Sequence, residues 1–319
     1  MKHRIVIIGG GAIALHLGTR LDNRGHDVRY FTRITREQMS FHDLIDLVRP
    51  HAVFLAISTT DKGEAALEYI LTCMKMGIPV IICEKGSLAY HAQVLRPHMS
   101  HIGFSASLGG GTRLLNYVAS HYPNEKKMNI QVVLNSTLNF IFDELRHGSF
   151  LVQACAAATK TGSPEPGASD ALSLINGELR DVHMKPCVFF NTVLAREQLI
   201  TPDMFGRLEL TKDDLRILNE KGGDYRMVVS FSNHPSTKVL PYFGKHFGIF
   251  CDGWHIEGGF RQITKSSGLE SWLPEGIGNA VHIAEGELGA QSIYTLSGPG
   301  AGLEPTTTAM LTDFRELCT

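Results

Sequence analysis

Long apolar runs and an excess of one charge are both missing from this sequence. None of its 319 residues lies in an apolar run of about 18, the length that a membrane-spanning helix needs. Lys and Arg number 30 and Asp and Glu number 32, a formal net charge of −2, so no basic surface for nucleic acid or for an anionic membrane is expected. We therefore expect neither a nucleic acid nor a membrane as a partner.

Cysteine and metal-binding patterns are scarce as well. The six cysteines include no CxxC pair, and a chain of this length needs no disulfide bonds to fold. The 15 histidines show no HExxH or other ligand spacing. The expectation is a reduced, cytoplasmic protein without a metal site.

What the sequence does contain is enough apolar material for a large core. A hydrophobic fraction of 43% and a mean hydropathy of −0.01 are typical of globular proteins. A length of 319 residues suggests two domains, or one domain with a large insertion.

A glycine motif near the N-terminus predicts dinucleotide binding. Residues 4–33 read as strand, glycine turn, helix and strand, with Gly9, Gly11 and Ala14 in a GxGxxA pattern. The first glycine allows a tight turn, and the second lets the backbone approach a pyrophosphate at the helix N-terminus. We expect the cofactor to contact the turn at Gly9, Gly11, Ala12 and Ile13. A doubly wound domain without a nucleotide stays open.

The end of the second strand favours NADP, with NAD still possible. An NAD-preferring site usually has Asp or Glu there, whereas this chain has Thr32, Arg33 and Arg36. A hydroxyl and two cations suit a 2′-phosphate, which a carboxylate would repel. The alternative is that both arginines lie in a solvated loop.

Strands and helices continue to alternate through the first half. Residues 51–59 read as a buried strand that ends in Ser58 and Thr59, and residues 78–89 as a strand that ends in Glu84 and Lys85. This alternation predicts a parallel sheet with helices on both faces, and Ser58, Thr59 and Lys85 at its ligand-binding edge. Lys85 could be catalytic or a surface lysine.

The second half has a different pattern. Residues 129–145 join a strand to a helix through a polar turn, and residues 227–232, 238–244 and 249–257 read as strands and turns without helices between them. This predicts a mostly antiparallel sheet in a second domain.

Charged residues are concentrated in one stretch of a chain that is only 19% charged. Residues 164–185 hold Glu165, Asp170, Glu178, Asp181 and Lys185. Asp181 and Lys185 are spaced i,i+4, as in an ordinary surface pair. The stretch is therefore either a solvated helix face or a polar substrate pocket.

Several segments, in order, resemble the homoserine dehydrogenase family over nearly the whole chain. The segments that carry the resemblance are GGGAIA, CEKGSLA, SASLGGGTRLL, LNSTLNFI, GSPEPGASD with NGELRDVHMK, and SGPGAGLEPTTTAM. The resemblance implies a Rossmann-type doubly wound parallel sheet over residues 1–124. It also implies a second α+β mixed-sheet domain for catalysis and dimerisation over 125–296. The loop and helix of 297–319 would return to the first domain.

The family's activity is the reversible NAD(P)-dependent reduction of L-aspartate 4-semialdehyde to L-homoserine. The resemblance implies a homodimer and a short form without a regulatory extension. Carried over to this sequence, Lys185 would be the acid/base, Asp181 and Glu165 would hold the amino acid, and Lys85 would be a second active-site lysine. Asp170, Thr137, Asn139 and Arg113 would complete the substrate site, and Gly300 would lie near the cofactor.

The sequence also departs from the family pattern. Ser105 stands where the family has a Glu linked to a monovalent cation, so no metal is expected, and Ser163 replaces an aromatic residue. Arg113 could contact a substrate carboxylate or lie on the surface. Pro186 directly follows Lys185, which predicts a kinked helix or one that starts later.

Three functions stay open on the sequence alone. The first is homoserine dehydrogenase. The second is a similar enzyme for a different amino- or oxo-acid aldehyde, which the changes at Ser105, Ser163 and Arg113 favour. The third is a catalytically weak nucleotide-binding protein, against which the retained Glu165, Asp181, Lys185 and Lys85 argue.

Overall fold

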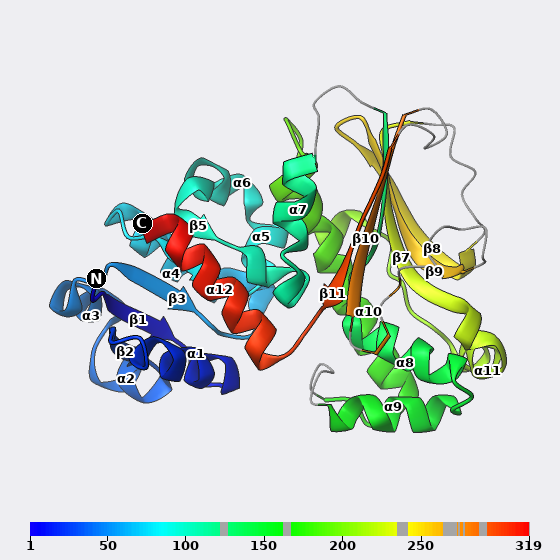
Figure 1. Ribbon diagram of the computed structural model, residues 1–319, viewed down its shortest axis with the longest axis horizontal. Helices are drawn as coiled ribbons and strands as arrows, with labels where there is room; N and C mark the ends of the chain where they lie inside the picture. Colours follow the sequence, from blue (N-terminus) through cyan, green and yellow to red (C-terminus); the bar gives the residue numbers. More distant parts are fainter. Residues whose placement is uncertain are drawn as a thin grey trace. The chain divides into compact units, whose positions relative to one another are not determined.

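The computed structural model describes residues 1–121, 127–161, 167–234, 242–263, 273, 275–276, 278–286 and 292–318. It divides into two compact units, one formed by Met1–Arg113 with Gly302–Thr319 and the other by Leu114–Ala301 (Figure 1). The first unit therefore takes residues from both ends of the chain.

The first unit contains a parallel sheet in the order β2-β1-β3-β4-β5. Its strands are β1 (Arg4–Ile8), β2 (Asp27–Phe31), β3 (Ala52–Leu55), β4 (Val80–Ile82) and β5 (Ile102–Gly103). Its helices are α1 (Ala12–Asp22), α2 (Arg33–Gln38), α3 (Phe41–Val48), α4 (Glu64–Lys75), α5 (Gly86–Tyr90), α6 (Ala92–Leu95) and α12 (Leu303–Cys318). The predicted Rossmann-type fold is confirmed.

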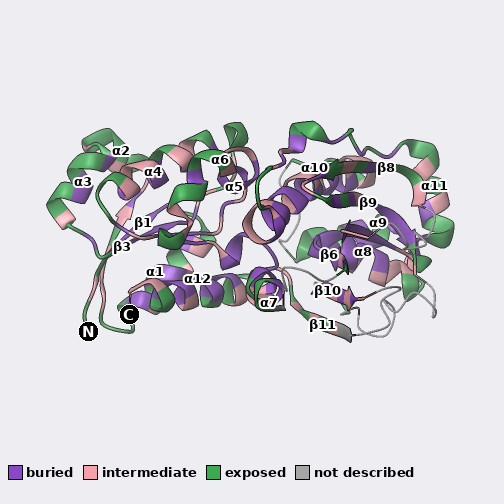
Figure 2. Ribbon diagram, turned by 90° about the horizontal axis from the view of Figure 1, so that it is seen from above, coloured by how far each residue is buried: buried purple, intermediate pink, exposed green. Residues whose placement is uncertain are grey.

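Both faces of this sheet are covered, which explains the uninterrupted apolar strands. Ile5 and Ile7 of β1 pack with Leu17 of α1 and with Met310 and Phe314 of α12 in one buried cluster. Figure 2 shows α1 and α12 on one side of buried β1 and β3, with α3 and α4 on the other side. Strands buried on both faces have no polar alternation, as parallel sheets require.

The second unit contains a sheet in the order β11-β10-β6-β7-β9-β8. Its strands are β6 (Met128–Val133), β7 (Tyr225–Ser232), β8 (Tyr242–Cys251), β9 (Trp254–Gln262), β10 (Gly278–Glu285) and β11 (Ser292–Pro299). Every pairing within the described strands is antiparallel, so this sheet is antiparallel and not mixed as the resemblance implied. Strands β8 and β9 are joined by a two-residue turn in which Asp252 and Gly253 both have positive φ, as a tight hairpin needs.

Helices cover one face of the antiparallel sheet. They are α7 (Leu114–His121), α8 (Ser136–Arg146) and α10 (Ala171–Phe189), while α9 (Leu151–Lys160) packs on α8 and α11 (Lys212–Lys221) packs on α9. Phe142 of α8 lies against Phe260 of β9, and Phe189 of α10 stacks on Phe231 of β7. Helix α7 packs on β10, which is why it belongs to this unit, although the sequence placed residues up to 124 in the first.

Helix α10 continues through Pro186, so of the two predicted alternatives, a kinked helix or one that starts later, the later start is wrong. It runs from Ala171 to Phe189 and passes into a π-helical turn over Phe190–Leu194. Proline lacks the N–H that would bond to the carbonyl of Val182, but the surrounding core buries Pro186 and holds the helix there. Lys185 therefore keeps its helical position relative to Asp181.

Candidate active site

Gly9 marks the point where β1 ends beside β3. Its φ is +131°, and a Cβ built on it would lie 2.3 Å from the carbonyl oxygen of Ala56, so only glycine fits. The sheet order places β1 and β3 at the topological switch point, where doubly wound folds bind ligands.

The open space that a phosphate would need lies beside Gly11. A Cβ built on Gly11 meets no atom of the described chain within 4 Å, and Gly11 immediately precedes α1. Ala12 and Ile13 form the first turn of α1, whose N–H groups have no intrahelical partners. This end of the helix therefore fits a cofactor pyrophosphate.

The second predicted cofactor region lies at the end of β2. Thr32 caps α2 by accepting from the Thr35 N–H at 3.5 Å, and Arg33 and Arg36 are exposed on that helix. The first turn of α2 contains no acidic residue. A built Cβ on Gly10 would lie 3.6 Å from the Thr32 methyl, so this helix starts beside the glycine turn.

The ends of β3 and β4 are tied together by Glu84, which is 2% exposed. Its carboxylate accepts from the Thr59 hydroxyl at 2.6 Å, from the Ser87 N–H at 3.0 Å and from the Gly86 N–H. Lys85 immediately precedes α5, and Ser58 is exposed next to Thr59. The structure thus brings Ser58, Thr59 and Lys85 to the same sheet edge as the glycine turn, as predicted for parallel strands.

The second unit brings charged side chains together in its interior. The Lys185 ammonium lies 2.5 Å from Asp181 Oδ2 and donates to the Leu134 carbonyl at 3.0 Å. The Asn135 amide donates to Asp181 Oδ2 at 3.3 Å and to Glu178 Oε2 at 2.7 Å. Asn135, Glu178 and Asp181 are buried, and the Lys185 side chain is 11% exposed.

The ammonium of Lys185 keeps one donor for a reacting group. An ammonium has three N–H donors, and Asp181 and Leu134 take two of them within the described chain. A buried lysine with a carboxylate partner and one remaining donor can give a proton to a carbonyl oxygen or take one from an alcohol.

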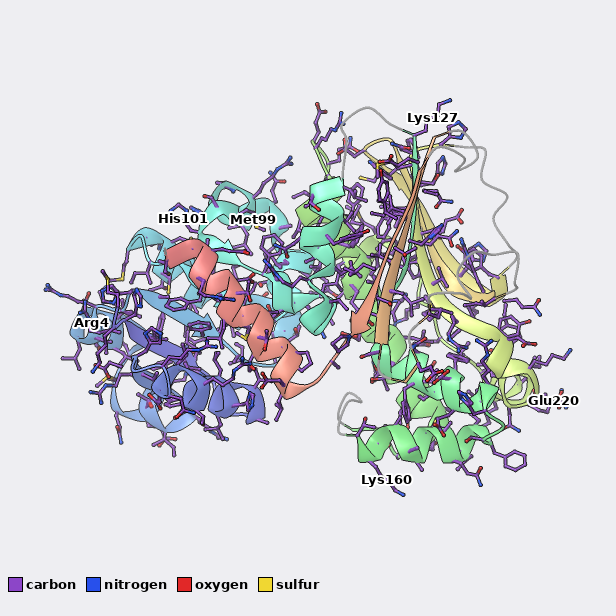
Figure 3. The ribbon with its side chains drawn as sticks, viewed as in Figure 1. Arg4, Met99, His101, Lys127, Lys160 and Glu220 are labelled. Carbon is purple, nitrogen blue, oxygen red and sulfur yellow. The ribbon has the colours of Figure 1, made fainter. Side chains whose placement is uncertain are left out.

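These charges differ from the ordinary charged faces of neighbouring helices. Figure 3 shows Lys160 and Glu220, on α9 and α11, extending away from the chain, and both are exposed. In α10, Glu178, Asp181 and Lys185 are thus gathered on one shielded face, whereas Arg180 is exposed.

The other predicted substrate residues are less closely grouped. Thr137 and Asn139 are buried in the first turn of α8, where Asn139 donates to the Gly276 carbonyl at 3.0 Å. Asp170 is exposed and caps α10, and the bond from the Ser173 N–H lowers the pKa of its carboxyl. Glu165 lies outside the described residues.

Arg113 is directed to the C-terminal helix and not to a pocket. Its guanidinium donates to both carboxylate oxygens of Glu316 at 2.8 and 2.9 Å and lies 3.9 Å from Asp313. Asp313 in turn accepts from the N–H and the hydroxyl of Ser105, and burial raises the pKa of its carboxyl. Both sequence departures therefore anchor α12 to the first unit.

Gly300 lies in the loop before α12, where a Cβ would meet the Asn279 side chain at 2.5 Å. Among the described residues, no three His, Cys, Asp or Glu side chains are grouped so that they could hold a metal ion. No described helix is both long and apolar enough to cross a membrane.

Sequence reasoning missed Asn135 and Glu178 as members of the cluster. Glu178 precedes Asp181 by three residues and Lys185 by seven, a spacing that places all three on one face of a helix. That signal was available for Glu178. The role of Asn135 depends on a contact 43 residues away and had no local signal.

Comparison with known proteins agrees with this fold. A curated homoserine dehydrogenase of Lactococcus lactis subsp. lactis (strain IL1403) is 24% identical over 278 residues, 85% of this chain but only 58% of that relative. The solved homoserine dehydrogenase of Thermoplasma acidophilum has a TM-score of 0.70 at 16% identity over 99% of both chains. A hyperthermophilic archaeal homoserine dehydrogenase in complex with NADPH has a TM-score of 0.65 at 18% identity, over 99% of this chain and 98% of that one.

The family model carries the assignment. It is described as homoserine dehydrogenase and matches residues 114–314, more than half of the chain, including the whole α10 cluster. The chain belongs to the homoserine dehydrogenase family.

Proposed function

We propose that the protein is an NADP-dependent homoserine dehydrogenase that reversibly reduces L-aspartate 4-semialdehyde to L-homoserine. The observation that carries the proposal is the buried contact of Lys185 with Asp181 and Leu134, inside the segment that matches the family model. An ordinary i,i+4 surface pair is exposed to solvent and needs no backbone partner. This pair is shielded from solvent and also bonds to the backbone carbonyl of Leu134.

The first unit would hold the cofactor through its own backbone and side chains. The glycine turn at Gly9 and Gly11 fits the pyrophosphate, and Arg33 and Arg36 would face a 2′-phosphate. A bound nicotinamide would supply the hydride. The NADPH complex of the similar archaeal enzyme supports the choice of NADP over NAD, with NAD as a possible second cofactor.

Lys185 would hold and move the proton. In the reducing direction its third N–H donates to the aldehyde oxygen, and in the oxidising direction the neutral amine accepts the alcohol proton. Asp181 orients the amine and, with Glu165, would accept from the substrate ammonium. Lys85 at the first unit's sheet edge would act as the second active-site lysine, while Asp170, Thr137 and Asn139 would shape the rest of the site.

Two of the three departures that favoured a different substrate have another cause. Ser105 and Arg113 bond to Asp313 and Glu316 of α12, so their changes follow from anchoring that helix. Ser163 lies outside the described residues. This supports aspartate semialdehyde as the substrate.

The direct test is NADPH oxidation with L-aspartate 4-semialdehyde, compared with acetaldehyde, succinate semialdehyde and glutamate 5-semialdehyde. We expect aspartate semialdehyde to have the highest kcat/KM. A higher value for another aldehyde, or no reaction with any, would refute the assignment.

Cofactor preference is tested at Arg33. Wild type should bind NADPH at least as tightly as NADH in a fluorescence titration, and Arg33→Glu should lose that preference because a carboxylate repels the 2′-phosphate. Glu220→Gln, on the second unit's α11, is the control. A tenfold NADH preference in wild type would remove Arg33 from the cofactor site.

The proposal extends to a homodimer in a reducing cytoplasm. The face of the antiparallel sheet on which no described helix packs, the helix-free face, has Asn129, Gln131 and Ser230 at its centre, beside an apolar cluster of Val133, Val228 and Ala280. The side-chain oxygens of Asn129, Gln131 and Ser230 have no hydrogen-bond partner in the described chain but are already inaccessible within one chain, so the homodimer is proposed from the family resemblance. All six cysteines are free, and burial raises the pKa of Cys73 to about 12, which suits inert thiols.

A further inference from the structure

Asn135 has both ends of its amide fixed by different elements. Its carbonyl oxygen accepts from the Leu138 N–H at 2.8 Å and so caps the N-terminus of α8. Its amide nitrogen must then point the other way, toward Glu178 at 2.7 Å and Asp181 at 3.3 Å. The hydrogen bonds therefore determine the orientation of this amide.

Glu178 is the member of the cluster that proton transfer does not use. It is 3% exposed, and it adds a second carboxylate to a site where Lys185 already has Asp181. Burying a carboxylate is costly unless its charge and hydrogen bonds are used. Glu178 lies on the same helix face as Asp181 and Lys185, and Asn135 links its carboxylate to that of Asp181, the partner of the ammonium.

Two nearby titratable groups of the described chain have partners elsewhere. His183, on the same helix, instead stacks near Phe205 and accepts from the Leu208 N–H. Asp143 of α8 lies 3.7 Å from Arg226 of β7. Within the described residues, Glu178 and Asp181 are the carboxylates that bond to Asn135, and Asp181 also contacts Lys185.

We propose that Glu178 is a positioning residue for this reaction. Through Asn135 it fixes the carboxylate of Asp181, and it adds a second negative charge to the site that holds the Lys185 ammonium. Asp181 alone would hold Lys185. Glu178 and Asn135 together determine where the Asp181 carboxylate lies and how readily the Lys185 ammonium gives up its proton. The inference rests on the proposed function for its kinetic part only.

Two substitutions separate charge from geometry. In Glu178→Gln the new carbonyl oxygen can still accept from Asn135, so the bridge is kept and the charge is lost. In Asn135→Ser the bridge is lost, but serine remains a good cap for α8. Arg180→Gln is the matched control, because Arg180 is an exposed charge on the same helix.

The first measurement follows the titration of Lys185 by NMR of protein with ¹⁵N-labelled lysine side chains. The Lys185 signal is identified by its absence in Lys185→Gln. We expect Glu178→Gln to lower the midpoint by about one pH unit, because a nearby negative charge favours the ammonium. Arg180→Gln should leave it unchanged. An unchanged midpoint in Glu178→Gln would overturn the proposal.

The second measurement is the pH profile of kcat for aldehyde reduction. Glu178→Gln should move the alkaline limb to lower pH by the same amount, and Asn135→Ser should lower kcat about tenfold without changing the KM for NADPH. If Glu178→Gln fails to fold, Asn135→Ser still tests the proposal. An Asn135→Ser variant with the kcat of wild type would refute the positioning role of Glu178. If wild type shows no activity with aspartate semialdehyde, the proposed function fails, whereas the substrate-free titration still tests Glu178.

Discussion

At the scale of single residues, the proposed chemistry depends on how Lys185 is held. Asp181, one helical turn earlier, and the Leu134 carbonyl, from a different element, take two of its donors. Removing the ammonium outright would leave carboxylates buried without compensation, a loss that typically costs about 3–5 kcal/mol. A useful variant therefore has to keep donors in place.

Lys185→Gln meets that requirement, since its amide N–H groups can still reach an acceptor. We expect it to fold and to bind NADPH while kcat falls about 10²–10⁴-fold, the usual contribution of a general acid/base. Thermal denaturation and a cofactor titration serve as controls. If Lys185→Gln stays within threefold of wild type while Lys85→Gln is inactive, the role belongs to Lys85.

The two glycines Gly9 and Gly11 of one turn differ in how much space surrounds them. Gly9→Ala must place a Cβ against the Ala56 carbonyl at φ +131°, and strained backbone of this kind costs about 1–3 kcal/mol before the clash is counted. Gly11→Ala meets no atom and should keep the stability of wild type but bind NADPH more weakly. Urea denaturation and NADPH titration of both variants test this, and equal stability of Gly9→Ala and wild type would contradict it.

At the scale of elements, three parallel strands begin beside histidines. The Nδ1 of His26 accepts from the His3 N–H at 3.2 Å, and the Nδ1 of His51 accepts from the Arg4 N–H at 3.0 Å. Phe314 of α12 lies edge-on to both His3 and His26. A protonated imidazole cannot accept these bonds.

Acid should therefore weaken the first unit. Burial lowers the pKa of His26 and of His3 below the ordinary value, with neighbouring positive charges as further causes. Because the folded pKa lies below the unfolded one, this contribution is complete above about pH 6.5 and is lost as the pH falls through the folded pKa.

His26→Asn retains an acceptor that does not titrate. Between pH 7.5 and 5.5 we expect the Tm of wild type to fall further than that of His26→Asn, by on the order of 2 °C. Differential scanning calorimetry at a series of pH values measures this. Parallel Tm profiles for the two proteins would show that protonation of His26 does not contribute to the loss of stability at low pH.

Local patterns predicted the elements well, because their signals repeat within a few residues. The glycine turn, the alternating strands and helices and the Asp181–Lys185 spacing are all of this kind. Contacts between distant residues had no such signal: Glu178 is 43 residues from Asn135, and Arg113 is 203 residues from Glu316. Local patterns could therefore not distinguish a substrate contact of Arg113 from a surface position, nor reveal its contact with α12.

At the scale of the whole molecule, the helix-free face of the antiparallel sheet bears on assembly. We expect light scattering at micromolar concentration to give about twice the mass of the 35.1 kDa chain, since a dimer would cover this face. Gln131→Arg combined with Ser230→Arg should yield a monomer through like-charge repulsion across a two-fold axis.

The control for that experiment lies on the helix-covered side. Val152 of α9 is 72% exposed, so Val152→Arg should leave the mass unchanged. A monomeric wild type would refute the dimer, and a dimeric Gln131→Arg/Ser230→Arg variant would place the interface elsewhere.

The first unit also has a consequence for how the protein is made. Its core includes Met310 and Phe314 of α12, so the strands made first lack one wall until residues 303–318 have been synthesised. Residues 114–301 are translated in between, which takes about 10–40 s at ordinary bacterial and eukaryotic rates. During that interval the nascent first unit exposes an apolar sheet face to the cell. The second unit is one continuous stretch of the chain and can fold before the first. The order of folding on the ribosome is thus the reverse of the order of the chain.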